Sequence, residues 1–102
     1  MDETSCGQYE NRALSSDEVK RFLPEVPDWQ VKDKAIEREL RFKDFIEAME
    51  FVNRVASLSQ AEDHHPDILI SYNRVVLTLS THKVGGLSCR DFLLATKIDR
   101  LS

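Results

Sequence analysis

The spacing of hydrophobic residues changes several times along the chain and predicts a series of short elements. Ser15 precedes a stretch with apolar residues at helical spacing, which predicts a short helix that Pro24 ends. Residues 29–32 and 35–41 then alternate between apolar and polar positions, as strands do. Residues 33–34 between them predict a hairpin turn.

Between Lys43 and Glu62 the hydrophobic period changes from two residues to about 3.6. This segment has no internal Gly or Pro, so we expect one long helix. His64-His65-Pro66 follows it, and the residue before a proline disfavours helical backbone. The apolar stripe that we expect in the core is Phe42, Phe45, Ile46, Met49, Val52, Val55 and Ala56.

The last third of the chain predicts two more strands and a helix. Residues 67–72 and 74–82 alternate, and Asn73 between them predicts a tight turn. Gly85-Gly86 interrupts the pattern, and Ser88 begins a final helix.

The predicted order is helix, two strands, long helix, two strands, helix. Strands and helices do not alternate in the way that a doubly wound parallel sheet requires. The sequence therefore predicts an α+β fold, with a four-stranded, largely antiparallel sheet and helices packed on one face. We expect a flexible tail over residues 1–14 and a single domain over residues 15–102.

Charge and composition exclude several classes of partner. Fourteen Lys and Arg against eighteen Asp and Glu give a net charge of −4 without a basic cluster, so we expect no direct nucleic-acid binding. No apolar run is long enough to span a membrane. Only Cys6 and Cys89 are cysteines, and the acidic first segment matches no targeting peptide. We therefore expect a reducing compartment and a cytoplasmic protein.

The three histidines, His64, His65 and His82, fall within a short stretch of the sequence. If the last two strands pair as a tight hairpin, Pro66 lies opposite residue 80, and His65 and His82 emerge at the same end of the sheet. Because imidazole titrates near neutral pH, such a group can donate and accept protons without a cofactor.

Three interpretations of the histidines stay open from the residues alone. The adjacent pair could cap the C-terminal end of the long helix, where the helix dipole favours a protonated imidazole. The cluster could hold a metal ion, although neighbouring side chains diverge and no cysteine ligand lies nearby. The third interpretation is a pocket for acid–base chemistry.

Several segments around the histidines fall at the spacing of a known family. They are Asp63-His64-His65-Pro66-Asp67, Tyr72-Asn73-Arg74-Val75, Thr78-Leu79-Ser80-Thr81-His82, Gly86-Leu87-Ser88 and Arg90-Asp91, together with Trp29 and Arg41-Phe42-Lys43-Asp44-Phe45. These segments resemble the pterin-4a-carbinolamine dehydratase family over residues 15–101.

The resemblance implies an enzyme that removes water from 4a-hydroxytetrahydropterin and gives the quinonoid dihydropterin, in the recycling of a tetrahydropterin such as tetrahydrobiopterin. It implies a pterin substrate, no metal, no organic cofactor, and a homodimer or homotetramer. The family's catalytic histidines correspond to His64, His65 and His82, of which we expect the last two beside the 4a carbon. Its substrate-binding or orienting positions correspond to Asp91, Pro66 and Gln60.

Two of these positions need a separate interpretation. Gln60 stands where the family usually has Glu or another ionisable residue, and we expect it on the same helix face as His64. A glutamine can form hydrogen bonds but cannot carry charge. Asp91 and Ser88 also fit a capping box at the start of the last helix, a structural role that is compatible with a functional one.

The resemblance also implies an alternative function. Proteins of this fold act as dimerisation partners of a homeodomain transcription factor or as enzyme-assembly factors, so the chain could be a non-catalytic binding module with an unknown protein partner. Such a module has no need for three histidines. The chain has all three, which favours the enzyme.

Overall fold

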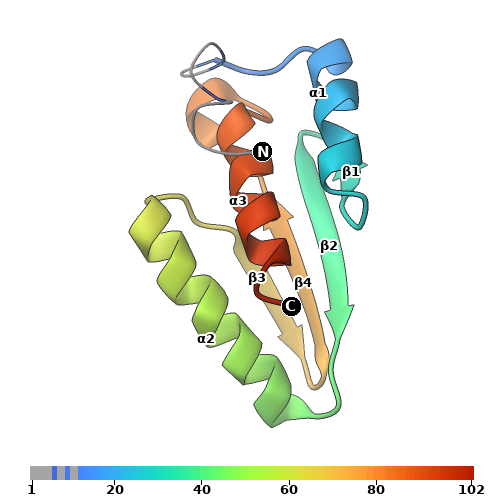
Figure 1. The fold of residues 1–102 in the computed structure, drawn as a ribbon, viewed down its shortest axis with the longest axis vertical. Helices are drawn as coiled ribbons and strands as arrows, with labels where there is room; N and C mark the ends of the chain where they lie inside the picture. The colour runs from blue at the N-terminus through green and yellow to red at the C-terminus, as the bar shows by residue number, and fades with distance from the viewer. Residues whose placement is uncertain (1–5, 7–8, 10–11) are drawn as a thin grey trace.

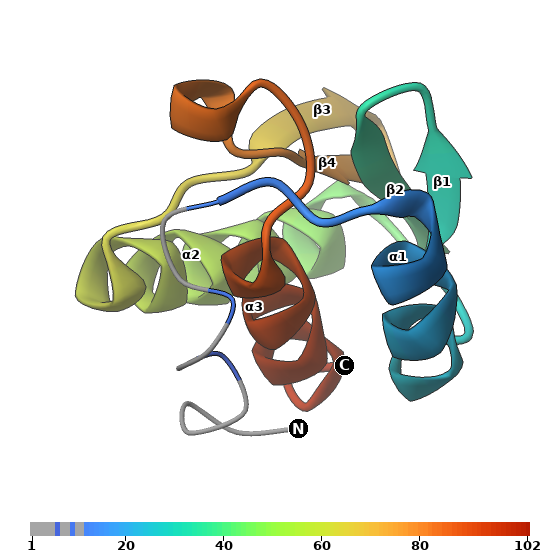
Figure 2. The same ribbon diagram turned by 90° about the horizontal axis from the view of Figure 1, so that it is seen from above.

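The computed structural model describes Cys6, Tyr9 and residues 12–102. Four antiparallel strands form one sheet in the order β1-β2-β4-β3. Figures 1 and 2 show the three helices on one face of this sheet, so the predicted α+β fold is confirmed. The elements are α1 (Ser16–Phe22), η2 (Leu23–Glu25), β1 (Gln30–Lys32), β2 (Ala35–Arg41), α2 (Phe45–Glu62), β3 (Asp67–Ser71), β4 (Arg74–Leu79), η3 (His82–Val84) and α3 (Cys89–Asp99), where η marks a 3₁₀ turn.

Local signals explain the ends of the first elements. Ser15 caps α1, as predicted, and the cap is a capping box with Glu18. The predicted two-residue turn joins β1 to β2, and Asp33 adopts a left-handed φ of 54° there. Asp44 caps α2 by accepting a hydrogen bond from the backbone N–H of Glu47 at 2.9 Å.

The second hairpin differs from the prediction by one residue. Tyr72, expected in the strand, has a left-handed φ of 54° and forms the turn together with Asn73. The register then pairs Asp67 with Thr78, so position 66 falls opposite residue 79 instead of residue 80. Because β4 also ends at Leu79, His82 lies in η3 and not at the end of a strand.

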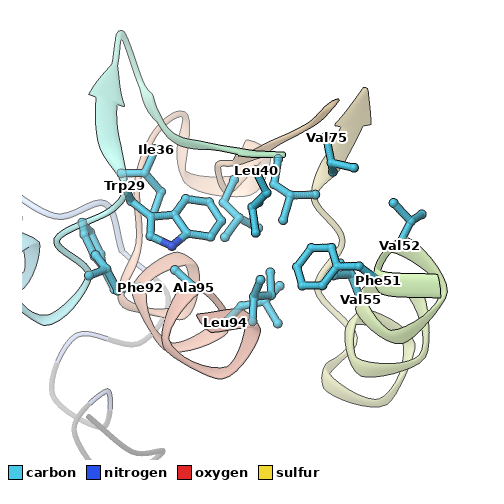
Figure 3. Close-up of a cluster of buried hydrophobic side chains, with 14 of the residues drawn as sticks. Trp29, Ile36, Leu40, Phe51, Val52, Val55, Val75, Phe92, Leu94 and Ala95 are labelled. Carbon is cyan, nitrogen blue, oxygen red and sulfur yellow. The ribbon is translucent and has the colours of Figure 1, made fainter. Parts of the chain in front are cut away.

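The core lies between the sheet and the helices. α2 buries Ala48, Phe51, Val52 and Val55 against it, a stripe that keeps helical spacing. The expected stripe was wrong at three positions, since Phe45 and Ile46 are 46% and 65% exposed and Ala56 is also exposed. Figure 1 shows the start of α2 beyond the β3–β4 turn, where no strand covers it. Figure 3 shows the core residues Trp29, Ile36, Leu40, Phe51, Val52, Val55, Val75, Phe92, Leu94 and Ala95.

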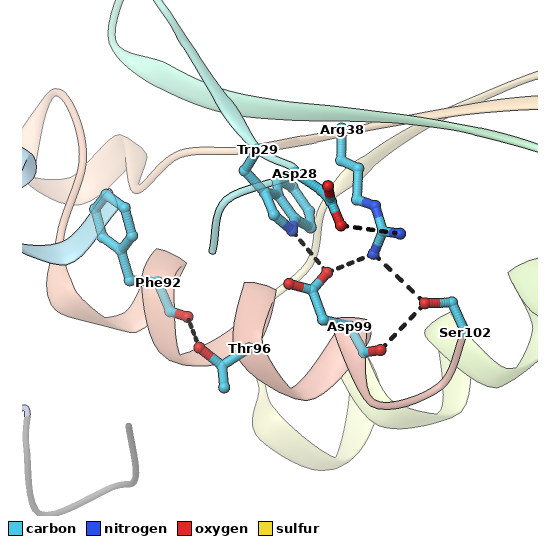
Figure 4. Close-up of polar contacts among 7 residues, drawn as sticks. All are labelled: Asp28, Trp29, Arg38, Phe92, Thr96, Asp99 and Ser102. Atoms are coloured by element: carbon cyan, nitrogen blue, oxygen red, sulfur yellow. Dashed lines mark hydrogen bonds and ion pairs between the residues drawn. The ribbon is translucent and has the colours of Figure 1, made fainter. Parts of the chain in front are cut away.

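Trp29 is a core residue that also anchors the end of α3. The residue is 3% exposed, and its Nε1–H donates a hydrogen bond to Asp99 at 2.8 Å (Figure 4). Arg38 donates to the same carboxylate oxygen at 2.5 Å, from the helix-facing side of β2. This cluster holds the C-terminal end of α3 against the sheet, whereas the histidines lie near the other end of the helix. Trp29 therefore belongs to the scaffold.

The two cysteines form a disulfide, which the cysteine count did not predict. Cys6 pairs with Cys89 across a sequence separation of 83 residues. The predicted flexible tail falls largely on residues 1–5, 7–8 and 10–11, which lie outside the described residues. Leu14, the last residue of that segment, donates its backbone N–H to the carbonyl of Leu87 at 2.8 Å. Across residues 6, 9 and 12–102, the structure contains no helix with the length and hydrophobicity to cross a membrane.

Candidate active site

A pocket of about 580 Å³ opens where α2 ends and η3 begins. His64, His65 and His82 all line it. The structure therefore brings together His65 and His82, which the hairpin was expected to place at one end of the sheet, and His64 lies with them. Figure 2 shows the end of α2 and the turn that contains η3 on the same side of the molecule. The volume falls within the range of small-molecule sites, roughly 300–1,000 Å³.

The end of α2 aims the first two histidines into this pocket. Asp63 adopts a left-handed φ of 52° and caps the helix through its backbone N–H. The N–H of His64 bonds to the carbonyl of Ser59 at 3.1 Å, which completes the turn. The backbone therefore caps the helix, while the side chains of His64 and His65 make other contacts. This finding disfavours the capping interpretation of the pair.

His64 belongs to a buried cluster centred on Asp91. Its Nε2–H donates to Oδ1 of Asp91 at 2.5 Å, and the two side chains are 13% and 0% exposed. The other carboxylate oxygen accepts from the hydroxyl of Thr81 and from the backbone N–H of Ser88, both at 2.9 Å. Because a buried carboxylate needs such donors, these contacts fix the position of Asp91 and, through it, the ring of His64.

Asp91 combines the two roles that the sequence left open. It completes the predicted capping box with Ser88 at the start of α3, and it also contacts His64. The hydroxyl oxygens of Ser88 and Thr81 lie 2.7 Å apart, and the Thr81 hydroxyl donates its hydrogen to Asp91. Thr81 is a member of this cluster that was not among the predicted site residues. Its place in the segment Thr78-Leu79-Ser80-Thr81-His82, directly before His82, was the available signal.

His65 has a different environment on the exposed side of the pocket. Its Nε2–H donates to Oε1 of Gln60 at 3.1 Å, and both residues are exposed. The expectation that Gln60 faces His64 was therefore wrong. The helix ends at Glu62, and the left-handed Asp63 rotates the following residues away from the helical spacing on which that expectation depended.

The remaining predicted site residues lie around the histidines. Pro66 connects His65 to β3 and is not among the residues that line the pocket. Arg90 lines it, and its guanidinium donates to the carbonyl of Glu62 at 2.8 Å, which joins the start of α3 to the end of α2. In the part of the chain that the structure describes, no three His, Cys, Asp or Glu side chains are grouped as metal ligands would be.

Comparisons with known proteins agree on one family. A family model described as "Pterin 4 alpha carbinolamine dehydratase" matches residues 12–101. A protein of Rhodospirillum rubrum, provisionally named a pterin-4-alpha-carbinolamine dehydratase, is 51% identical over 90 residues, which cover 86% of this chain and 94% of the relative. A similarly named protein of Picosynechococcus is 47% identical over 88 residues, which cover 86% of this chain and 96% of the relative.

Two solved structures share the fold. A transcriptional coactivator/pterin dehydratase of Brucella melitensis superimposes with a TM-score of 0.84 at 35% identity and covers 88% of this chain and 98% of its own. A pterin dehydratase-like protein identified as a RuBisCO assembly factor in the alpha-carboxysome has a TM-score of 0.59 at 23% identity over 72% of this chain and 84% of its own, a likeness of fold alone. The chain belongs to the pterin-4-alpha-carbinolamine dehydratase family.

Proposed function

We propose that this protein dehydrates 4a-hydroxytetrahydropterin to quinonoid dihydropterin in the recycling of a tetrahydropterin such as tetrahydrobiopterin. The observation that carries the proposal is the convergence of His64, His65 and His82 on one pocket of suitable volume. Membership of the dehydratase family supports the same substrate class. The residues at the site supply acid–base groups, and no step of the proposed reaction draws on a metal or an organic cofactor.

The reaction needs two proton transfers at neighbouring atoms of the pterin. The hydroxyl on carbon 4a must gain a proton to leave as water, and nitrogen N5 must lose one. His65 and His82 carry out these transfers, one as the acid and the other as the base. Both are exposed at the pocket, so each can exchange its proton with solvent after a turnover.

His64 orients the substrate. Because its Nε2–H donates to Asp91, its Nδ1 is the nitrogen that remains to accept a hydrogen bond from the pterin. Asp91 acts as a positioning residue that holds this tautomer. Gln60 positions His65 in the same manner but adds no charge. Pro66 sets the direction in which the chain leaves His65.

An ultraviolet assay of dehydration tests the proposal. Purified protein should accelerate the loss of 4a-hydroxytetrahydropterin over the spontaneous reaction, and a variant with all three histidines replaced by alanine should not. Chelator treatment should leave the rate unchanged, whereas loss of activity that Zn²⁺ restores would favour a metal site.

A different outcome would favour the alternative function. If the wild-type protein does not accelerate the reaction, a non-catalytic binding module becomes the better account, in line with the coactivator named in the Brucella melitensis relative. The assay therefore separates the two functions with one preparation.

We further propose a cytoplasmic protein that assembles into a homodimer or homotetramer. β3 is an edge strand of the sheet, and Leu69 on it is 52% exposed. An exposed apolar edge strand favours pairing with another chain. Light scattering of the purified protein measures the assembly, and a monomeric mass would contradict it.

A further inference from the structure

Two residues outside the family match contribute to the pocket. The match begins at residue 12, yet Cys6 and Tyr9 line the pocket together with the three histidines. We call these two residues the amino-terminal wall. The wall lies outside the matched region, and none of the proton transfers proposed above uses it.

The disulfide attaches the wall beside the buried cluster. Cys89 is the first residue of α3, between Ser88 and Asp91, and it is 1% exposed. Cys6 is 6% exposed and pairs with it. A covalent bond therefore fixes one end of the wall to the helix start that also carries the carboxylate partner of His64.

Aromatic and charged contacts hold the other end of the wall. The ring of Tyr9 meets Phe22 edge-on, with a centroid distance of 5.4 Å. The guanidinium of Arg12 lies over the same ring at 5.2 Å. Arg12 also pairs with Glu18 at 2.6 Å, and hydrogen bonds from Arg12 and from the backbone of Ser15 lower the pKa of Glu18 to about 2.

We propose that the amino-terminal wall is a binding element of the pocket and that the redox state of the Cys6–Cys89 disulfide controls its contribution. The disulfide-bonded protein holds Cys6 and Tyr9 against one side of the pterin. Reduction frees Cys6 and weakens binding without moving His64 and His65, since their contacts come from Asp91 and Gln60. The inference concerns the same pocket as the proposed function and rests on it for the identity of the ligand.

The redox step is ordinary thiol–disulfide exchange. A dithiol attacks one sulfur, forms a mixed disulfide and leaves as its own disulfide, which supplies the two electrons and two protons that the Cys6 and Cys89 thiols take up. Cys6 and Cys89 are only 6% and 1% exposed, but both line the pocket, so a dithiol approaches the bond from the pocket side. In a cytoplasmic protein, a disulfide is typically transient and redox-sensing.

The first experiment tests the wall without a ligand. Titration of denatured protein with a thiol reagent should find no thiols before dithiothreitol treatment and two after it, as one disulfide requires. Reaction of His64, whose side chain is 13% exposed in the disulfide-bonded protein, with diethyl pyrocarbonate should be several-fold faster in the reduced form, as peptide mass spectrometry resolves. Two free thiols in untreated protein, or equal reaction rates in both forms, would overturn the proposal.

The second experiment measures ligand binding with biopterin as the fluorescent probe. The dissociation constant should rise about fivefold when dithiothreitol is added to the wild-type protein. Cys6→Ser is the matched control: it should show the weaker affinity in both conditions and no response to dithiothreitol. In the dehydration assay, KM should rise by the same factor while kcat changes less than twofold, because uniform binding is lost. Equal dissociation constants for the oxidised and reduced wild type would contradict the proposal.

Substitution of Tyr9 separates the contribution of its ring to binding from the effect of the Cys6–Cys89 disulfide. Tyr9→Ala should weaken biopterin binding about fivefold with the disulfide intact, and Tyr9→Phe should keep the affinity because the ring that contacts Phe22 remains. Tyr72→Ala removes an exposed tyrosine from the β3–β4 turn and should have no effect. An unchanged affinity in Tyr9→Ala would show that Tyr9 contributes nothing.

The outcomes separate this inference from the proposed reaction. Redox-dependent shielding of the histidines in a protein without dehydratase activity would support the wall and contradict the reaction. Dehydratase activity with the same KM and the same shielding in both redox forms would support the reaction and contradict the wall.

Discussion

The pocket has a buried side and an exposed side, and each holds one member of the adjacent histidine pair. On the buried side, His64 contacts a carboxylate that is 0% exposed and has two further donors. On the exposed side, His65 donates to the neutral amide oxygen of Gln60 at 3.1 Å.

This difference assigns different work to chemically identical side chains. A ring fixed by a buried carboxylate keeps one tautomer and one orientation, which suits recognition of a substrate. A ring at an exposed surface with a neutral partner can gain and lose a proton as water reaches it, which suits general acid–base catalysis. His82, which is also exposed, belongs with His65 in this comparison.

The largest expected effect comes from the exposed histidines. His65→Ala and His82→Ala should each lower kcat for dehydration by roughly 10²-fold or more, the usual scale for losing a general acid or base. The ultraviolet assay measures this, and Asn53→Ala on the exposed surface of α2 is the control. Near-normal turnover in both folded histidine variants would remove their proposed role.

A smaller effect should follow from loosening the buried side. Thr81→Val removes one of the donors to Asp91, so the carboxylate holds His64 less firmly. We expect turnover to fall about tenfold, comparable to losing one hydrogen bond to a charged group.

Two related variants sharpen this prediction. Thr81→Ser keeps the hydroxyl and should restore the rate, while Thr78→Val makes the same chemical change on β4 and should leave it unaltered. Nitrogen NMR of the His64 ring provides a second measurement, because a loosened ring should no longer hold a single tautomer. Equal rates for Thr81→Val and wild type would show that Asp91 needs no help from Thr81.

Giving the exposed side a carboxylate should make it resemble the buried side. In Gln60→Glu, the new charge lies beside His65 and favours its protonated form. The part of the pH–rate profile that depends on that form should extend to higher pH, and the rate near neutral pH should rise a few-fold. Profiles from about pH 5.5 to about 9, with Asn53→Asp as the matched charge control on α2, measure the effect. Superimposable profiles of Gln60→Glu and wild type would refute the charge argument.

The smallest effect lies outside the pocket and concerns stability. Hydrogen bonds from Arg12 and Ser15 lower the pKa of Glu18 from 4.5 to about 2. Because the folded state favours the charged form, this contribution is present above about pH 4.5 and is lost as the pH falls toward about 2. The free energy of unfolding should fall less over that interval in Glu18→Gln than in wild type, as urea titrations would show. Parallel pH dependence in the two proteins would contradict the assignment.

The periodic parts of the sequence predicted the fold well. The alternation over residues 35–41 predicted β2 at its observed bounds, and the long segment with a hydrophobic period of about 3.6 residues predicted α2. Both patterns arise because one face of each element is buried. The same reasoning failed where one residue decided the outcome. Tyr72 adopts a left-handed backbone conformation that a tyrosine does not predict. The observed hairpin register therefore differs by one residue from the predicted one.

The candidate site was only partly predictable for a related reason. The histidines and Asp91 were found from their spacing and from the family resemblance, but their partners depend on the tertiary structure. Asp63 ends helical spacing one residue before His64, so Gln60 reaches His65 instead. The Thr81–Asp91 hydrogen bond and the Cys6–Cys89 disulfide form only because the chain folds back on itself. Two cysteines far apart in the sequence do not indicate that they form a disulfide.

Rescue by added imidazole tests most directly the claim that the exposed histidines transfer protons while the buried one orients. The dehydration rates of His65→Ala, His82→Ala and His64→Ala are measured as free imidazole is increased at constant pH and ionic strength. We expect imidazole to restore activity to the first two variants in proportion to its concentration and to leave His64→Ala and wild type unchanged. Rescue of His64→Ala alone, or of none of the three, would contradict it.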